Sequence, residues 1–260
     1  MKNFIFKTIS LCAAAPLVIS HMLTTPDRHT IAYTYYPAGH EKVVIIAHGF
    51  YNSKDAVVLQ QLAKHFLPEY DVFMFDFRGH GQSSGLFTWT SEEGQDLNAV
   101  FDFVEARYKK IGIIAFSIGG SVAINELSKR QRADSLVCVS APSVMSRIDY
   151  QWWALDWDQD FIYTMLTKEG RKGKGVRPGP FWLAKEKPIT SVEKLTVPVL
   201  YIHGDRDWVI RPWHSQALYN KTKTIKKIVF IEKGLHAEYL IRGFPEQFYR
   251  EVDQWFHKTL

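Results

Sequence analysis

Six short apolar runs, separated by segments with helical spacing, constrain the fold of this chain more than any other feature. The runs are rich in Val and Ile and are near-continuous rather than alternating, which is typical of strands buried on both faces of a parallel sheet. They lie at residues 43–49, 72–79, 111–117, 135–141, 197–204 and 226–234. Because strand and helix alternate along the chain, we predict an α/β protein with a mostly parallel sheet and helices on both of its faces.

The segments between these runs have the apolar spacing of amphipathic helices. We predict helices at residues 54–66, 91–108, 119–129 and 245–257. In the second of them, Thr90 and Glu93 have the three-residue spacing of a capping box, so the helix is expected to begin there.

Residues from about 144 to 195 interrupt the alternation. No buried strand is predicted there, and the stretch is too long for an ordinary connection. We therefore predict a small helical cap, inserted before the strand at 197–204 and lying over the sheet edge where open α/β folds bind ligands. The aromatic residues of this stretch are Trp152, Trp153, Trp157, Phe161, Tyr163 and Trp182. Most of them are expected to form the cap's own core, but an aromatic cap also favours an apolar acyl or aryl group over a sugar.

The charged residues of the predicted cap leave several interpretations open. The stretch Arg171–Arg177 is basic and rich in Gly, which is typical of a solvated loop. It could instead form a lid over an anion such as a phospholipid head group or an acyl-CoA. Four aspartates, Asp149, Asp156, Asp158 and Asp160, could hold the free amine of a peptide substrate.

The first twenty residues form an apolar segment with two competing interpretations. Lys2 and Lys7 precede the apolar run, and Val18 and Ser20 are spaced as at a signal-peptidase site. However, residues 17–36 resemble an opening β-hairpin, which cleavage after Ser20 would cut. We expect a cytoplasmic protein with one domain at residues 21–260; the alternative is an exported or membrane-tethered protein, with membrane association through residues 1–20. No other apolar stretch reaches the ~18 residues that a membrane-spanning helix needs.

Charge and cysteine content exclude several other classes. The formal net charge is +5, and the 32 basic residues are scattered rather than arranged in a stripe. We therefore expect no nucleic-acid partner. Cys12 and Cys138 are the two cysteines; they suggest no disulfide framework and lack the spacing of metal ligands. We expect no cofactor and no metal.

The stretch IIAFSIGG (113–120) places a serine at the junction of a predicted strand and a predicted helix. Ser117 stands between Ala115 and Gly119, and Gly120 follows. This arrangement is typical of a nucleophile elbow, a turn so tight that it needs small neighbours. A plain helix cap remains the alternative.

The other members of a catalytic set follow in chain order. A serine hydroxyl needs a general base and an acid that orients the base. Asp205 and Asp207 follow the strand at 197–204, and His236 follows the strand at 226–234. All lie where parallel strands end, at the same sheet edge as Ser117. Asp207 is the favoured acid and Asp205 the turn cap; His236 is the predicted base, although it could also be a surface histidine.

Two backbone N–H groups are predicted to form the oxyanion hole. One belongs to Ile118, which directly follows the serine. The other belongs to Phe50, in the loop His48–Phe50 after the first buried strand. Gly49 allows this loop to bend tightly, and His48 is expected to brace it rather than to act in catalysis.

With these residues, the chain resembles the α/β-hydrolase superfamily of serine hydrolases. Residues 76–83 (DFRGHGQS) match the D-x-R-G-x-G-x-S loop that is common there. The resemblance covers about Thr24 to the C-terminus except the cap. It implies an eight-stranded, mostly parallel sheet with an early antiparallel strand, and the triad Ser117–Asp207–His236. Within the superfamily the chain is most similar to the esterase, monoacylglycerol-lipase-like and serine aminopeptidase group. It departs from the usual pattern at Ala115 and at residues 26–29.

A serine rather than an aspartate at the elbow limits the types of reaction that the chain can catalyse. Dehalogenases and epoxide hydrolases of this superfamily have aspartate at the elbow, so serine here implies acyl transfer. We predict a serine hydrolase that cleaves small-molecule carboxylic esters of apolar acyl groups through an acyl-enzyme. An acyl-thioesterase or serine peptidase with the same triad is the alternative, and a non-catalytic binding protein is a third class.

Overall fold

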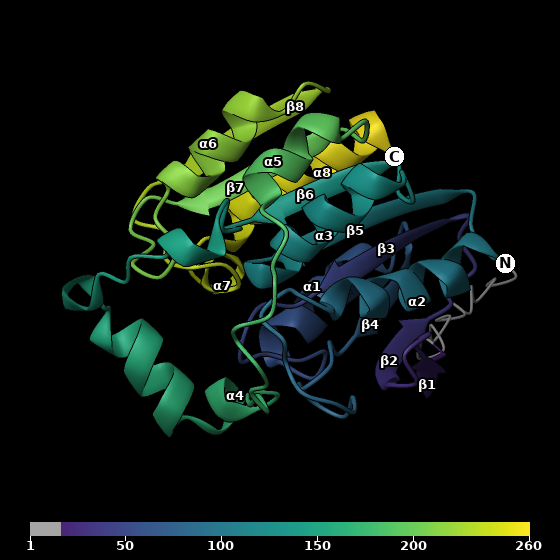
Figure 1. Cartoon of the computed structure of the whole chain (residues 1–260), viewed down its shortest axis with the longest axis horizontal. Helices are drawn as coiled ribbons and strands as arrows, with labels where there is room; N and C mark the ends of the chain where they lie inside the picture. Colours follow the sequence, from purple (N-terminus) through teal and green to yellow (C-terminus); the bar gives the residue numbers. More distant parts are fainter. Residues whose placement is uncertain (1–16) are drawn as a thin grey trace, which may run out of the picture.

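An eight-stranded sheet forms the centre of the protein (Figure 1). The computed structural model describes residues 17–260. The strand order is β1-β2-β4-β3-β5-β6-β7-β8; β2 is antiparallel to both β1 and β4, and all other neighbours are parallel. The strands are β1 (Ile19–Thr24), β2 (Thr30–Tyr36), β3 (Lys42–Ala47), β4 (Asp71–Phe75), β5 (Lys110–Phe116), β6 (Ser135–Val139), β7 (Val199–Gly204) and β8 (Lys226–Ile231). The predicted fold class is confirmed.

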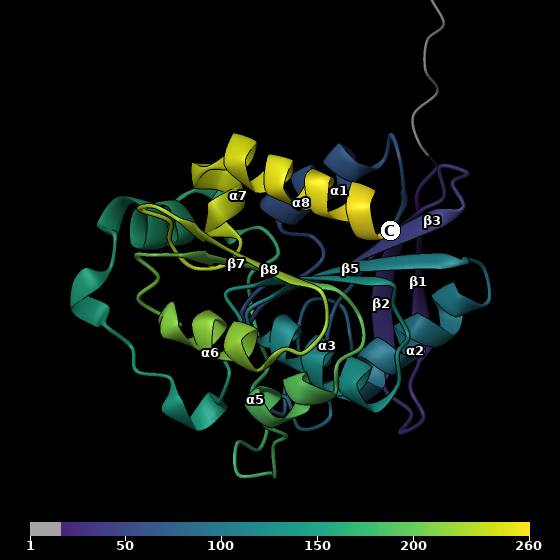
Figure 2. The ribbon, with the colours of Figure 1, turned by 90° about the horizontal axis from the view of Figure 1, so that it is seen from above.

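Helices cover both faces of the sheet, which explains why its strands are apolar on both sides (Figure 2). One face packs on α1 (Val57–Phe66), α7 (Tyr239–Gly243) and α8 (Pro245–Thr259), and the other on α2 (Glu93–Glu105), α3 (Ile118–Lys129) and α6 (Trp213–Lys221). In β3, Val44 and Ile46 face the helices α1, α7 and α8. Val43 and Ile45 face the helices α2, α3 and α6 on the other side of the sheet. Successive strand residues point to opposite faces, so each face needs its own apolar residues.

The start of α2 differs from the expected capping box. Its N-cap residue is Glu92, whose own side chain makes no capping hydrogen bond, whereas the Thr88 hydroxyl accepts the Glu92 N–H (2.9 Å). Thr90 has a φ of 77°, outside the extended conformation that an N-cap residue adopts. Glu93 instead accepts hydrogen bonds from the N–H (2.6 Å) and the hydroxyl (3.0 Å) of Thr88. The predicted pair of Thr90 and Glu93 is therefore wrong, because the carboxylate closes the preceding loop.

Helix α6 was not predicted, because its buried face is largely polar. His214, Ser215 and Leu218 are its buried residues. His214 Nδ1 lies 2.8 Å from the Ser143 hydroxyl, and the Ser215 hydroxyl lies 2.6 Å from Nδ1 of His203. Leu218 is the one buried residue of α6 that joins the apolar core, and hydrogen bonds hold the other two, so the helix leaves no apolar period in the sequence.

The opening hairpin takes in the end of the N-terminal apolar segment. Ile19 and Ser20 already belong to β1, where they pair with Tyr35 and Thr34. Residues 1–16, which include most of the predicted signal or anchor and Cys12, lie outside the described residues. Within residues 17–260, no helix is long and apolar enough to span a membrane.

Between β6 and β7 the chain leaves the core and passes over one end of the sheet (Figure 1). The short helices of this excursion are η1 (Met145–Arg147), η2 (Trp152–Ala154), η3 (Trp157–Leu166) and α4 (Lys168–Arg171); α5 (Pro188–Ser191) and η4 (Val192–Lys194) follow. The chain rejoins the core at α5, where Pro188 and Ser191 are buried. We call residues 144–187 the cap segment.

Candidate active site

Ser117 lies in a strained turn between β5 and α3. Its backbone has φ 50° and ψ −118°, a conformation that L-residues rarely adopt. A Cβ atom added to Gly119 would lie 2.6 Å from the His48 carbonyl oxygen, and one added to Gly120 would lie 2.7 Å from Cβ of Ala141. The two glycines therefore allow α3 to pack directly against its neighbours. The geometry of the turn is that of a nucleophile elbow.

We expect Gly119→Ala to destabilise the fold, even though alanine is the better helix former. The new methyl group would collide with backbone oxygen, which cannot rotate away. The free energy of unfolding should fall by about 1–3 kcal/mol in urea titrations. Gly243→Ala is the matched control, since a Cβ there would meet nothing within 4 Å. Equal midpoints for the two variants would contradict the steric argument.

The structure brings the three predicted catalytic residues into one row of hydrogen bonds. His236 Nε2 lies 3.0 Å from the Ser117 hydroxyl, and His236 Nδ1 lies 2.7 Å from Oδ2 of Asp207. Asp207 is buried, and the His236 side chain is 13% exposed. The side chains come from the loops after β5, β7 and β8. Asp205 is exposed, so only Asp207 joins the row.

Further hydrogen bonds fix Asp207 in this row. Its Oδ1 accepts the N–H groups of Val209 (3.0 Å) and Ile210 (2.8 Å). His203 Nε2 lies 3.1 Å from Oδ2 of Asp207, the oxygen that also faces His236. Asp207 therefore has little freedom to rotate away from His236. Sequence reasoning missed His203, which lies inside an apolar strand.

The surroundings of Asp207 and His236 favour a negatively charged carboxylate beside a positively charged imidazolium. Burial alone would raise the pKa of Asp207, but attraction to His236 and the hydrogen bonds of His203 and His236 outweigh it and lower this pKa. Burial would lower the pKa of His236, but the Asp207 carboxylate outweighs that effect and raises it. Glu238 and Asp160 raise it further. A proton accepted by His236 is thus stabilised.

The loop after β3 lies against Ser117. His48 Nδ1–H donates to the Gly49 carbonyl (2.7 Å), and His48 Nε2 accepts the N–H of Phe77 (3.0 Å). Both ring nitrogens are thus engaged within the protein, as a bracing role requires. Within residues 17–260, the N–H groups of Phe50 and Ile118 have no hydrogen-bond acceptor. These are the two predicted oxyanion donors.

Comparison with known proteins agrees with this geometry. A family described as the alpha/beta hydrolase fold matches residues 42–176, half of the chain. This chain belongs to the α/β-hydrolase fold family. Its solved neighbours include the Pyrococcus furiosus esterase Pf2001, which is 22% identical, has a TM-score of 0.74, and aligns over 94% of this chain and 93% of that one. At this identity the similarity demonstrates the fold alone.

Two curated relatives are similar over part of their length. The uncharacterized protein YfhR of Salmonella typhimurium is 29% identical over 204 residues, which cover 75% of this chain and 64% of YfhR. The alpha/beta hydrolase domain-containing protein WAV2 of Arabidopsis thaliana is 26% identical over 183 residues, 66% of this chain and 56% of WAV2. This α/β-hydrolase therefore aligns with less than two thirds of either relative.

A second carboxylate, missed by sequence reasoning, lies close to the nucleophile of this α/β-hydrolase. Oε1 of the buried Glu238 accepts the N–H of Gly49 at 3.0 Å. A Cβ atom added to Gly49 would lie 3.0 Å from this oxygen and 3.2 Å from Cβ of Ser117. Glu238 thereby joins the His236 loop to the His48–Phe50 loop. Its only sequence signal is a position two residues after His236, which does not distinguish it from a surface glutamate.

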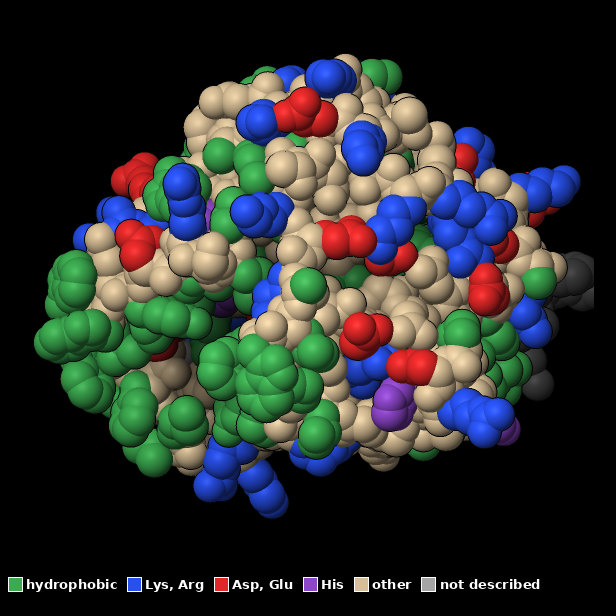
Figure 3. Space-filling model, viewed as in Figure 1, with side chains coloured by type: hydrophobic (Ala, Val, Ile, Leu, Met, Phe, Trp, Pro, Cys, Tyr) green, Lys and Arg blue, Asp and Glu red, His purple; other side chains and the backbone are tan. Residues whose placement is uncertain are grey.

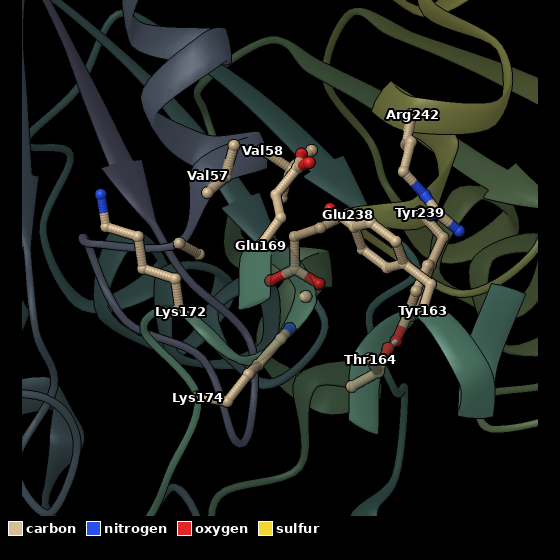
Figure 4. A pocket seen from close by; sticks show the side chains of 12 residues that line it. Val57, Val58, Tyr163, Thr164, Glu169, Lys172, Lys174, Glu238, Tyr239 and Arg242 are labelled. Carbon is tan, nitrogen blue, oxygen red and sulfur yellow. Dashed lines mark hydrogen bonds between the residues drawn. The ribbon is translucent and has the colours of Figure 1, made fainter. Parts of the chain in front are cut away.

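A pocket opens beside Glu238, between α1, the cap segment and α7 (Figure 4). Its lining is partly apolar and partly charged. It consists of Ala56, Val57, Val58, Tyr163, Thr164, Glu169, Gly170, Lys172, Lys174, Glu238, Tyr239 and Arg242. The Lys174 amine points toward the Glu238 carboxylate across the pocket (Figure 4). Burial lowers the pKa of Lys174, and Glu238 opposes this in part.

The backbone of the basic stretch Arg171–Arg177 packs against the domain, while the side chains of Arg171, Lys172 and Arg177 are exposed. Gly173 has a φ of 74°, and a Cβ atom there would lie 2.5 Å from the Ala56 nitrogen. The Gly175 N–H donates to the Tyr51 carbonyl (3.2 Å). The Arg177 N–H donates to the Gly79 carbonyl (2.7 Å), within the D-x-R-G-x-G-x-S loop. These contacts hold Lys174 over the pocket.

Within residues 17–260, no group of three or more His, Cys, Asp or Glu side chains is placed to hold a metal ion. Cys138 is buried and free, and burial raises the pKa of its thiol. Arg206 and Arg211 line another cavity, beside Trp208, while Arg147 is exposed in η1. These arginines do not gather at the mouth of the pocket that Glu238 lines.

Proposed function

We propose that this protein is a serine hydrolase that cleaves carboxylic esters of apolar acyl groups through an acyl-enzyme. The observation that carries the proposal is the row of hydrogen bonds from Ser117 through His236 to Asp207. The serine stands in a strained elbow, next to two backbone N–H groups that have no acceptor within residues 17–260. Membership of the α/β-hydrolase family and the esterase among its structural neighbours support the same class.

In the first half of the reaction, the Ser117 hydroxyl attacks the ester carbonyl carbon. His236 Nε2 takes the hydroxyl proton, and Asp207 stabilises the resulting imidazolium. The N–H groups of Phe50 and Ile118 stabilise the negative oxygen of the tetrahedral intermediate. When the ester C–O bond breaks, His236 returns the proton to the leaving alcohol. Ser117 then carries the acyl group.

In the second half, water replaces the alcohol. His236 Nε2 takes a proton from the water, which attacks the acyl carbon of the acyl-enzyme. Collapse of the second tetrahedral intermediate releases the carboxylic acid, and the Ser117 oxygen recovers its proton from His236. The residues that act are the same in both halves.

The apolar side chains of the pocket support an apolar acyl group. Val57, Val58 and Tyr239 provide surface that an acyl chain can cover. The test is a series of p-nitrophenyl esters of increasing acyl length, measured beside acyl-thioesters and peptide anilides. We expect kcat/KM to be highest for the esters. Turnover of thioesters or anilides alone would contradict the ester proposal and leave the serine mechanism intact.

One observation favours a second candidate, hydrolysis next to a free amine. The Glu238 carboxylate lies beside the Gly49 N–H and Ser117, where it could pair with an ammonium group close to the scissile carbonyl. Aminoacyl p-nitroanilides and their N-acetyl derivatives separate the two cases. Faster turnover of the free amines, lost in Glu238→Gln, would support a peptidase. Equal turnover would exclude it.

The pH dependence of kcat/KM should reflect the raised pKa of His236. His236 must be neutral to accept the Ser117 proton, so activity is lost as pH falls through its folded-state pKa. Asp207 outweighs burial and raises this pKa above the ordinary value of 6.5. We therefore expect kcat/KM for a neutral ester to reach half its plateau above pH 6.5, when measured from about pH 5 to 9 at constant ionic strength. A midpoint below the ordinary value would contradict the arrangement.

A further inference from the structure

The outer side of the cap segment is apolar and has no partner within the described chain. Its large hydrophobic side chains are 43–74% exposed. They are Trp152, Trp153, Trp157, Phe161, Ile162, Met165, Leu166, Phe181 and Trp182. We call this set the outer cap surface. Figure 3 shows hydrophobic side chains gathered over this end of the molecule, around a hollow. Apolar patches of this kind usually mark an interaction site.

Helix η3 is oriented with its polar contacts toward the domain. Asp160 accepts the indole N–H of Trp208 (2.7 Å), and the Thr164 hydroxyl lies 2.5 Å from the Tyr239 hydroxyl. On the other side, Trp157 and Leu166 are 67% and 64% exposed. A helix of a water-soluble domain normally has the opposite arrangement, with its apolar side inward. Asp158 is also exposed on this helix, but most of the exposed side chains of η3 are apolar and suited to an apolar environment.

The charged residues next to the outer cap surface indicate which kind of partner it binds. Five basic residues and one acidic residue lie between Lys168 and Arg177, directly after η3. Lys168, Arg171 and Lys172 are exposed. Tryptophan beside exposed Lys and Arg is the combination found where proteins lie on lipid, because the indole ring suits the head-group region and the cations attract anionic lipids.

A second copy of the chain fits this surface less well. A two-fold contact buries the same patch on both copies. It would bring the basic stretch that begins at Lys168 in one copy close to the same stretch in the other. Like charges that face each other oppose association. An anionic bilayer instead offers an apolar layer and opposite charge on the same side.

We propose that the outer cap surface docks on an anionic lipid bilayer. The Trp and Phe side chains enter the head-group boundary, while Lys168, Arg171 and Lys172 contact the lipid charges. The cap segment also contributes to the lining of the pocket that contains Glu238. This binding does not depend on hydrolysis, and it stands if the proposed ester chemistry fails.

The test is sedimentation of the full chain with vesicles, in the Ser117→Ala background so that no ester is cleaved. Vesicles of phosphatidylcholine with about 30% phosphatidylserine are compared with phosphatidylcholine alone. One variant carries Trp152→Ser, Trp157→Ser and Phe161→Ser. A matched control carries Met22→Ser, Ile225→Ser and Phe230→Ser, which removes three side chains that are 40–59% exposed outside the cap segment.

We expect the cap variant to bind anionic vesicles about tenfold more weakly or worse, and the control to bind as the parent does. Lys168→Glu with Arg171→Glu should also weaken binding to anionic vesicles. Brominated acyl chains should quench tryptophan fluorescence in the parent more than in the cap variant. Equal sedimentation of cap and control variants would overturn the proposal and place any binding elsewhere, for example in residues 1–16. The proposal would also be overturned if neither the parent nor the cap variant binds vesicles, and the parent self-associates while the cap variant does not.

Discussion

Ser117→Ala should reduce kcat for ester hydrolysis by a factor on the order of 10⁶, to the background rate. The change removes the atom that forms the acyl-enzyme, while the elbow, the two N–H donors and the pocket remain. Initial rates with a p-nitrophenyl ester, at saturating substrate, give the measurement.

The fold should survive this substitution, because it removes one buried oxygen and adds no volume. Far-UV circular dichroism and the urea midpoint serve as checks. Ser128→Ala is the activity control, because Ser128 lies in the last turn of α3, the helix that follows Ser117, and its hydroxyl donates to the Asn125 carbonyl. A folded Ser117→Ala variant that retains more than a few per cent of parental kcat would show that another group is the nucleophile.

Asp207→Asn should reduce kcat by about 10⁴-fold. In the parent, the Asp207 carboxylate accepts a hydrogen bond from His236 Nδ1–H, which leaves the unprotonated Nε2 facing Ser117. An asparagine amide can donate to Nδ1 instead. The proton would then sit on Nε2, in the tautomer that cannot accept the serine proton.

Asp205→Asn is the matched control, because Asp205 is two residues away, follows the same strand and is exposed. It should keep nearly full activity. The ratio between the two variants is the measured quantity. Similar losses in both would mean that the loop after β7 needs its total charge rather than one oriented carboxylate.

Much of this architecture could be predicted because the relevant patterns are local in sequence. A strand such as β3, buried on both faces, must be apolar throughout, and Ser117 needs small neighbours because its turn is strained. The carboxyl ends of parallel strands share one edge of the sheet. The sequence alone therefore predicts Asp207 and His236 near the serine.

The remaining features depend on contacts that a linear pattern does not reveal. Glu238 matters because it accepts the Gly49 N–H, from a residue 189 positions away. Helix α6 buries histidine and serine, so it carries no apolar period. Glu93 closes its own preceding loop, which its spacing from Thr90 could not indicate. In the first two of these cases a polar side chain makes its contacts through tertiary structure rather than through neighbours along the chain.

The cap segment shows a different limit. Its aromatic residues indicated a cap core, since tryptophan is usually well buried. The structure instead leaves Trp152 and Trp182 more than 70% exposed. Composition alone cannot say whether an apolar side chain faces a protein core or a lipid surface, because both environments exclude water.

Covalent labelling with a fluorophosphonate tests the central claim most directly. The full chain is treated with the probe, digested, and the modified residue is identified by mass spectrometry. A phosphonyl group on Ser117, absent in His236→Ala, is the predicted result, since only a serine activated by a base reacts at a useful rate. Labelling at another residue would contradict the account. So would the absence of any labelling in folded protein that also does not hydrolyse soluble esters.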